Sequence, residues 1–212
     1  MGDRYSDRDV LMAERGHQGS LKGVDLTFCD LSGIDLSGLD LSGMSISGGS
    51  LRGANLEGAD LSDLFAMNAD FSQARCKGAK MSRAFLQRVK LHGADLTGVD
   101  LHGSSLLICE LDNVSLQRAD LTGAQILESQ LHNVDFSGAL LPRAVLRDTE
   151  VDGARFIGCD LRGTDLRKAN ITHAEFREVL TEGAIYYGKA PWDGADSQEK
   201  VVSEPNDLFD GE

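Results

Sequence analysis

The sequence contains few aromatic residues, few prolines and no long apolar segment. Among 212 residues there are 3 Pro, 1 Trp, 3 Tyr and 8 Phe, so we expect a core of small and aliphatic side chains. No apolar run approaches the roughly 20 residues that a membrane-spanning helix needs. The N-terminal segment MGDRYSDRDVLMAERG carries charges of both signs and lacks the apolar stretch of a secretory signal. These absences predict a cytoplasmic protein with no membrane association.

Positive charge is also scarce. The chain has 21 Lys and Arg against 34 Asp and Glu, which gives a formal net charge of −13. Proteins that bind nucleic acid neutralise its phosphates with Lys and Arg, so we expect no direct contact with DNA or RNA. The same acidity is compatible with binding to a protein that itself holds DNA.

Cysteine and histidine do not form a metal-binding or catalytic pattern. The cysteines have no CxxC spacing, and no histidine lies at metal-ligand spacing from them; they are Cys29, Cys76, Cys109 and Cys159. Carboxylates are common, but nothing predicts the cleft that would tune the pKa of one for general acid–base catalysis. We therefore expect no enzyme, no cofactor and no metal site.

The sequence does contain a repeat of five residues. Every fifth residue from Leu21 to Phe176 is apolar, through 32 consecutive positions without an insertion. The residue two positions before each of these centres is small or aliphatic, most often Ala, and never charged. The residue between them is often Asp or Asn, and the residue two positions after the centre is often Gly. A period of five fits neither an α-helix nor a flat strand.

A square coil satisfies this pattern. Each pentapeptide forms one side, its small residue and its centre point into a narrow lumen, and Gly near the corner accepts backbone angles that larger residues resist. Stacked coils then pair their backbones at about the 4.8 Å spacing of neighbouring strands.

The segments GANLEGADLSD (53–63) and GADLTGVDLHG (93–103) resemble the A-(D/N)-L-x-x pattern of the pentapeptide-repeat family. The resemblance extends over residues 19–178. It implies an all-β fold, a right-handed quadrilateral parallel β-helix with four pentapeptides per coil. It further implies about 8 coils and a rod of roughly 38 Å at the strand spacing.

Three regions are predicted. Residues 1–18 form an N-terminal cap with a short helix over 6–16, in which Val10 and Leu11 cover the first coil. Residues 19–188 form the β-helix, and an apolar group closes its far end: Ala184, Ile185, Tyr186, Tyr187 and Trp192. Residues 189–212 form an acidic flexible tail. The tail is either a frayed terminus or a docking peptide, whose apolar residues would be Val201, Val202, Leu208 and Phe209.

Positions that are 20 residues apart lie on the same outer face, and one face is unusually apolar. We call it the apolar face; its members are Phe65, Met67, Phe85, Leu107, Ile108, Leu127 and Val145. A contiguous exposed apolar patch usually marks an interface. A homodimer is the simplest version, because two equal patches can meet about a two-fold axis. The alternative is that these side chains fold over their neighbours or contact the tail.

The face that follows along the chain is the most acidic. We call it the acidic face; its members are Asp30, Asp70, Glu110, Asp112, Glu150 and Asp152. The histidines of this face are interpreted as surface residues.

Two functions remain open. The first is a non-enzymatic scaffold that recruits a protein through the apolar stripe and the adjacent acidic face. The second comes from a distant resemblance to the Qnr-type quinolone-resistance proteins. These are understood to mimic DNA and to bind DNA gyrase or topoisomerase IV, which would make DNA gyrase a partner. The loops that interrupt the Qnr-type repeat are absent from this sequence.

Overall fold

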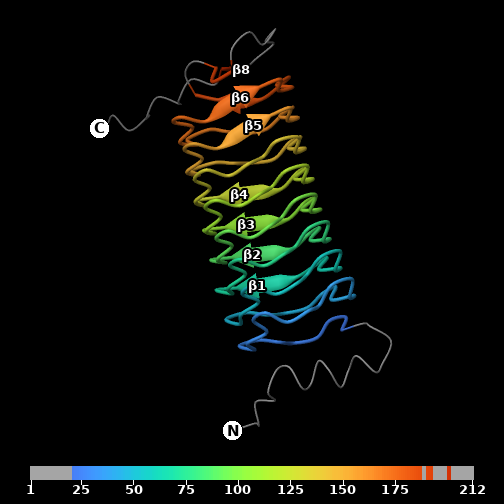
Figure 1. The fold of residues 1–212 in the computed structure, drawn as a ribbon. Coiled ribbons are helices and arrows are strands. Elements are labelled where there is room, and N and C mark those ends of the chain that lie inside the picture. Colours follow the sequence, from blue (N-terminus) through green and yellow to red (C-terminus); the bar gives the residue numbers. More distant parts are fainter. Residues whose placement is uncertain (1–20, 188–189, 193–199, 202–212) are drawn as a thin grey trace, which may run out of the picture.

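The chain is a parallel β-solenoid that winds into a rod of stacked coils (Figure 1). The computed structural model describes residues 21–187, 190–192 and 200–201. The predicted cap over residues 1–18, with its helix, lies outside these residues. The predicted fold class, an all-β pentapeptide-repeat solenoid, is confirmed. No described segment is a helix of the length and apolarity that crossing a membrane requires.

Each coil takes 20 residues and has four sides. Asp25, Asp30, Asp35 and Asp40 each form a parallel bridge with the residue 20 positions later. On the first of these sides the pairing continues in the same register from Asp25 to Ile185. The uninterrupted period of five is thus converted into four straight columns of paired backbone.

Short strands occur where neighbouring coils pair over two or three successive residues. One parallel sheet contains β1 (Phe65–Met67), β2 (Phe85–Gln87), β3 (Ser105–Leu107) and β4 (Gln125–Leu127) in that order. A second sheet pairs β5 (Arg155–Ile157) with β6 (Glu175–Arg177), and a third pairs β7 (Ile185–Tyr186) with β8 (Lys200–Val201). The β1–β4 sheet forms one side of the rod, and Figure 1 shows its four strands stacked in chain order.

The core fills the lumen. The predicted centres are buried without exception from Leu26 to Leu166, and Leu86, Leu96 and Leu116 among them are at most 2% exposed. The centres nearer the ends, Leu21 and Phe176, are partly buried. Burying a Leu side chain stabilises a fold by roughly 1.5–3 kcal/mol, and here that contribution recurs in every pentapeptide.

The backbone conformation at the corners explains why glycine is frequent two positions after each centre. The N–H of Val24 donates to the carbonyl of Leu21 at 3.2 Å, which closes a four-residue turn. The third residue of that turn, Gly23, has φ of 67°, as a type II turn requires. The corner residues that are not glycine, such as Arg88 and Ile108, adopt the same left-handed conformation. Glycine is therefore favoured at the corner but not obligatory.

The Asp and Asn column also has a structural cause. One carboxylate oxygen of Asp25 accepts the backbone N–H of Thr27 at 3.0 Å, and Asp30 does the same for Ser32 at 3.0 Å. This is the local Asx bond that stabilises turns. Hydroxyl and backbone hydrogen bonds lower the pKa of Asp25 and of Asp30. Much of the acidity of the chain thus belongs to the folding pattern.

The far end of the rod is closed by aromatic side chains. Tyr186 and Trp192 are buried, and their rings meet edge to face at 5.0 Å. Strand β8 pairs in parallel with β7 on the last coil. Of the residues predicted as a tail, 190–192 and 200–201 are described, and both segments contact the solenoid. The others lie outside the described residues.

Candidate interaction surface

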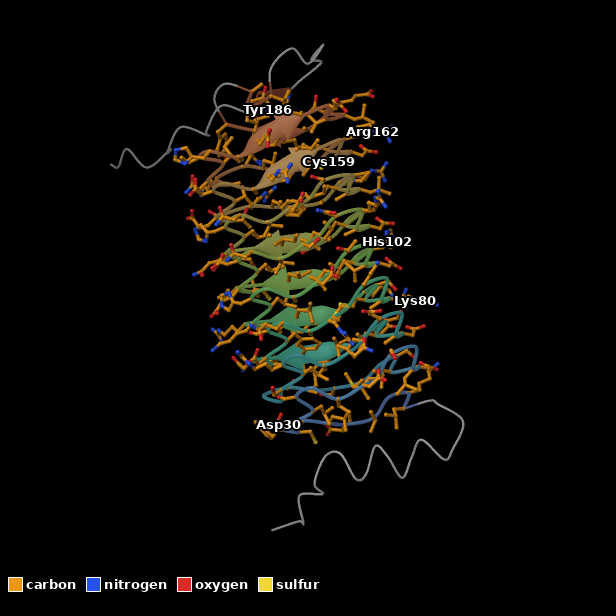
Figure 2. All side chains as sticks on the ribbon, in the orientation of Figure 1. Asp30, Lys80, His102, Cys159, Arg162 and Tyr186 are labelled. Carbon is orange, nitrogen blue, oxygen red and sulfur yellow. The ribbon has the colours of Figure 1, made fainter. Side chains whose placement is uncertain are left out.

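Side chains project outward along the length of the rod, as Figure 2 shows for Asp30, Lys80, His102 and Arg162. The apolar face carries a cluster of seven apolar side chains at outward positions, whereas another side exposes Leu140 and Leu180. In β1 the side chain of Ala66 is buried, whereas Phe65 is 43% exposed and Met67 is half-buried on the outer side. The alternation of a strand therefore presents Phe65 and Met67 to solvent.

The apolar residues align in columns across the sheet. Phe65 pairs with Phe85, and their rings stack at 5.2 Å with an interplanar angle of 10°. A second column runs from Met67 through Gln87 and Leu107 to Leu127. Ile108, at the corner beside this column, is 37% exposed. Val145 continues the first column by bridging to Gln125, so all seven predicted residues share one face. Their role as an interface stays a prediction.

Sequence reasoning missed one member of this surface. Phe28 is 74% exposed and lies in the same corner column as Ile108, four coils earlier. Its ring covers Gly48, where an added Cβ would come within 2.6 Å of two ring carbons. The spacing of 20 residues could have identified Phe28. Phe28 was missed because no other large outward apolar side chain lies between it and the main cluster, which begins at Phe65.

The residues of the acidic face lie along one side of the rod, and their carboxylates have local partners that the sequence did not indicate. The bridges run from Asp30 through Ser50, Asp70, Lys90, Glu110 and Gln130 to Glu150. Asp70 lies 4.0 Å from the guanidinium of Arg52, and Glu150 accepts a hydrogen bond from the amide of Asn170 at 2.6 Å.

Three histidines complete this face. His92 contacts Glu110 at 2.6 Å, His132 contacts Asp112 at 2.8 Å, and His173 contacts Asp152 at 2.9 Å, each through a ring nitrogen. The sequence interpretation placed these histidines at the surface but assigned them no partner. The missed indication was the spacing, since His132 follows Asp112 by one whole coil.

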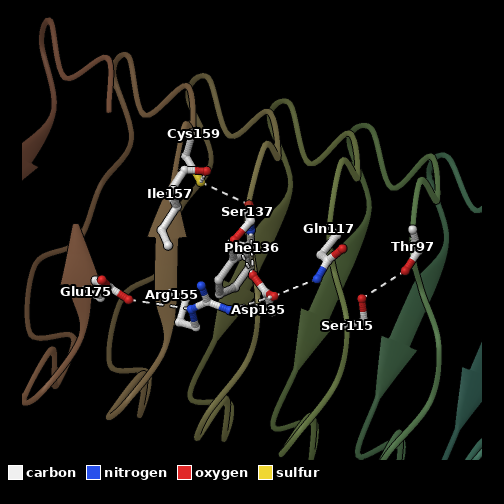
Figure 3. A network of polar contacts seen from close by, with 10 residues as sticks. All are labelled: Thr97, Ser115, Gln117, Asp135, Phe136, Ser137, Arg155, Ile157, Cys159 and Glu175. Carbon is white, nitrogen blue, oxygen red and sulfur yellow. Dashed lines mark hydrogen bonds and ion pairs between the residues drawn. The ribbon is translucent and has the colours of Figure 1, made fainter. Parts of the chain in front are cut away.

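The side centred on Asp135 contrasts with the apolar face because its polar groups satisfy one another (Figure 3). Asp135 accepts hydrogen bonds from Gln117 at 2.6 Å and from Arg155 at 3.4 Å. Arg155 also lies 3.5 Å from Glu175. Such ladders link successive coils and leave few unmet groups for a binding partner.

The described part of the chain holds no cluster of three or more His, Cys, Asp or Glu that could bind a metal ion. The thiols of Cys76, Cys109 and Cys159 are buried. Burial raises the pKa of Cys76 to about 12 and the pKa values of Cys109 and Cys159 to about 11. These thiols stay protonated at neutral pH, whereas a cysteine nucleophile must ionise.

Comparison with known proteins identifies the repeat. A family model described as pentapeptide repeats (8 copies) matches residues 25–63 and 69–106, and one described as pentapeptide repeat region matches residues 109–186. Comparison with curated proteins gave no match.

Several solved structures are similar to this chain. HetL, a pentapeptide-repeat protein involved in heterocyst differentiation regulation in the cyanobacterium Nostoc sp. strain PCC 7120, is 23% identical. The match covers 84% of this chain and 96% of HetL with a TM-score of 0.30. Full-length QnrB1, a plasmid-mediated fluoroquinolone resistance protein, is 26% identical over 78% of this chain and 85% of QnrB1, with a TM-score of 0.32. Because these TM-scores are low, the assignment rests on the two family models. On that basis the chain belongs to the pentapeptide-repeat family.

Proposed function

We propose that this chain is a non-catalytic scaffold that binds a protein partner through the apolar face. The observation that carries the proposal is the row of outward apolar side chains on β1–β4, from the stacked pair Phe65 and Phe85 to Leu127. Large apolar patches on a soluble protein commonly mark protein interfaces. Aromatic side chains at the centre of such a patch supply much of the binding energy.

The neighbouring acidic face supports the same function. Ile108 lies at the corner, Cys109 points into the lumen, and Glu110 begins the next side. The apolar patch is thus bordered along one edge by a column in which carboxylates alternate with Lys90 and Gln130. Charged groups along the edge of an apolar patch fix the orientation of a bound partner, and they accelerate association where the partner's charges complement them.

Paired substitutions test the proposal. Phe85→Asp with Leu107→Asp places two charges in the middle of the apolar face. The matched control is Leu140→Asp with Leu180→Asp, because both leucines are exposed on a different side of the rod. Proteins captured by the wild type should be lost from the first variant and kept by the second. Each captured protein, once purified, should bind the wild type and the Leu140 and Leu180 variant more tightly than the Phe85 and Leu107 variant. Equal capture by both variants contradicts a docking role for this face.

A second candidate is a DNA mimic that binds DNA gyrase or topoisomerase IV. It is supported by the regular column of Asp30, Asp70, Glu110 and Glu150, which places a carboxylate on every second coil. That spacing is about 10 Å along the rod. The test is a gyrase supercoiling assay with and without a quinolone. It should compare the wild type with a variant in which Glu110 and Glu150 are changed to Gln. Absence of both inhibition and protection at micromolar protein eliminates this candidate.

A further inference from the structure

One corner column of the apolar face places opposite charges at equal distances on the two sides of an apolar residue. Arg88, Ile108 and Glu128 are each 20 residues apart, all three are exposed, and their φ angles are 52°, 55° and 51°. The column therefore presents a cation, an apolar group and an anion, with Arg88 and Glu128 about 10 Å apart along the rod.

The two charges are not used within the solenoid. None of the ion pairs among the described residues involves Arg88 or Glu128. By contrast, Arg83, on the same coil as Arg88, forms a two-pronged ion pair with Asp63 at 2.8 Å. Arg75 and Lys80 also contact carboxylates on the preceding coil. Arg88 and Glu128 project beside exposed apolar groups, where a docked surface would cover them.

From this order we propose that the apolar face binds a second copy of this chain in an antiparallel, two-fold arrangement centred on β3. This inference rests on the proposed docking role of the face and names its partner. A two-fold axis that runs along the β3 strand, within the interface, reverses the rod direction and keeps each column opposite itself. Ile108 then faces Ile108 of the second copy, and Arg88 faces Glu128 of the second copy. The reciprocal ion pair forms at the same time.

The same rotation also aligns the other two columns. Leu107 faces itself, Gln87 faces Leu127 of the second copy, and Phe85 faces Gln125 of the second copy. No like charges meet in any of these pairs. A parallel two-fold arrangement would instead place the Arg88 column opposite the Phe85 column, and the arginine would lose water without gaining a carboxylate. Burying an unpaired charge is costly, so the antiparallel arrangement is favoured.

The interface is small, because the aligned contacts extend over three coils, from Phe85 to Glu128. Stable dimers bury about 800 Å² on each partner, so we expect a weak dimer that forms at high chain concentration. The apolar contacts supply affinity, and the two reciprocal ion pairs mainly select the antiparallel register.

Charge reversal tests the arrangement by sedimentation equilibrium. In Arg88→Glu both contacts become Glu against Glu, and in Glu128→Arg both become Arg against Arg. Each single variant should dimerise at least about tenfold more weakly than the wild type, because two attractive pairs become repulsive. Both substitutions place a residue type that this column already accommodates at positive φ, so folding should be retained and is checked by thermal unfolding.

Mixing the variants gives the decisive result. Arg88→Glu and Glu128→Arg together should form a one-to-one heterodimer, since both contacts are then Glu against Arg, and the double variant should dimerise like the wild type. A wild type that stays monomeric at millimolar concentration overturns the dimer and leaves capture of another protein by this face intact. Single variants that dimerise normally overturn the antiparallel register. Loss of partner capture through the apolar face is measured separately, by the Phe85 and Leu107 variant.

Discussion

Phe156 stacks face to face on Phe176, with ring centroids 4.8 Å apart and an interplanar angle of 3°. Phe136 lies on the other side of Phe156 at 4.7 Å, so three successive coils share one ladder of rings in the lumen. Trp192 ends the ladder by meeting Phe176 edge to face at 5.7 Å. The non-repeating segment after the last coil thus returns one side chain to cover the open end of the tube.

Replacing Trp192 with Ala should therefore destabilise the rod. Trp192 is 4% exposed, and removing a large buried aromatic group typically costs about 3–5 kcal/mol. The variant should unfold at a clearly lower urea concentration when followed by circular dichroism. Trp192→Phe is the matched control, because it keeps an aromatic ring against Phe176 and Tyr186. If Trp192→Ala unfolds at the same urea concentration as the wild type, the tryptophan does not close the end.

Replacing either of two buried serines with alanine should change the stability of the fold in opposite directions. The hydroxyl of Ser104 is buried and has no hydrogen-bond partner among the described residues. Ser129 is equally buried, but its hydroxyl donates to the carbonyl of Leu127 at 2.9 Å and accepts the N–H of Cys109 at 3.0 Å. A buried polar group without a partner costs free energy that a paired one does not.

Ser104→Ala should accordingly stabilise the fold by about 1 kcal/mol, and Ser129→Ala should destabilise it by about 1–3 kcal/mol. Both substitutions place alanine, the commonest residue of this column, in a lumen of the same kind. Free energies of unfolding from urea titrations of the two variants provide the measurement. Changes of the same sign would show that hydrogen bonding does not distinguish the two sites.

Acid should remove stability that Asp160 contributes. Its carboxylate accepts two hydrogen bonds from the guanidinium of Arg162, at 2.9 and 2.6 Å. These bonds are the main reason why the pKa of Asp160 is lowered. A group whose pKa is lower in the folded chain stabilises the fold fully above its unfolded pKa, near 4. That contribution is lost as the pH falls through the lower folded value.

Asp160→Asn should be less stable than the wild type at pH 7, and the difference should shrink between pH 4 and pH 2. Urea unfolding at several pH values measures it. The stability of the wild type alone is not sufficient, because burial raises the pKa of Asp165 and so gives the pH dependence of the whole chain a contribution of opposite sign. The difference between the two proteins removes that contribution. A difference that stays constant across this range would contradict the role of the Arg162 contact.

The fold could be predicted from the sequence because one physical rule decides it. The centre of every pentapeptide from Leu26 to Leu166 is buried, and the period alone places these centres in the lumen. The same period placed Phe65 and Leu127 on one face. The spacing of one coil places His132 beside Asp112, but their hydrogen bond also depends on side-chain conformations, which a count of positions does not contain. The return of Trp192 to the lumen occurs where the repeat has ended, so no periodic signal could locate its contact with Phe176.

The lumen also protects three of the four thiols from reaction. Cys76, Cys109 and Cys159 are buried, whereas Cys29, in the first coil, is partly exposed. Because burial raises the pKa of Cys76 to about 12 and those of Cys109 and Cys159 to about 11, very little thiolate is present at pH 8. Since thiolate is the reactive form, Ellman's reagent should modify at most Cys29 rapidly in the native chain. All four cysteines should react after unfolding in guanidinium.

Cys29→Ser is the control and should abolish the fast native reaction. Rapid modification of more than one cysteine in the folded wild type would mean that the coils open far more readily than their continuous hydrogen bonding predicts.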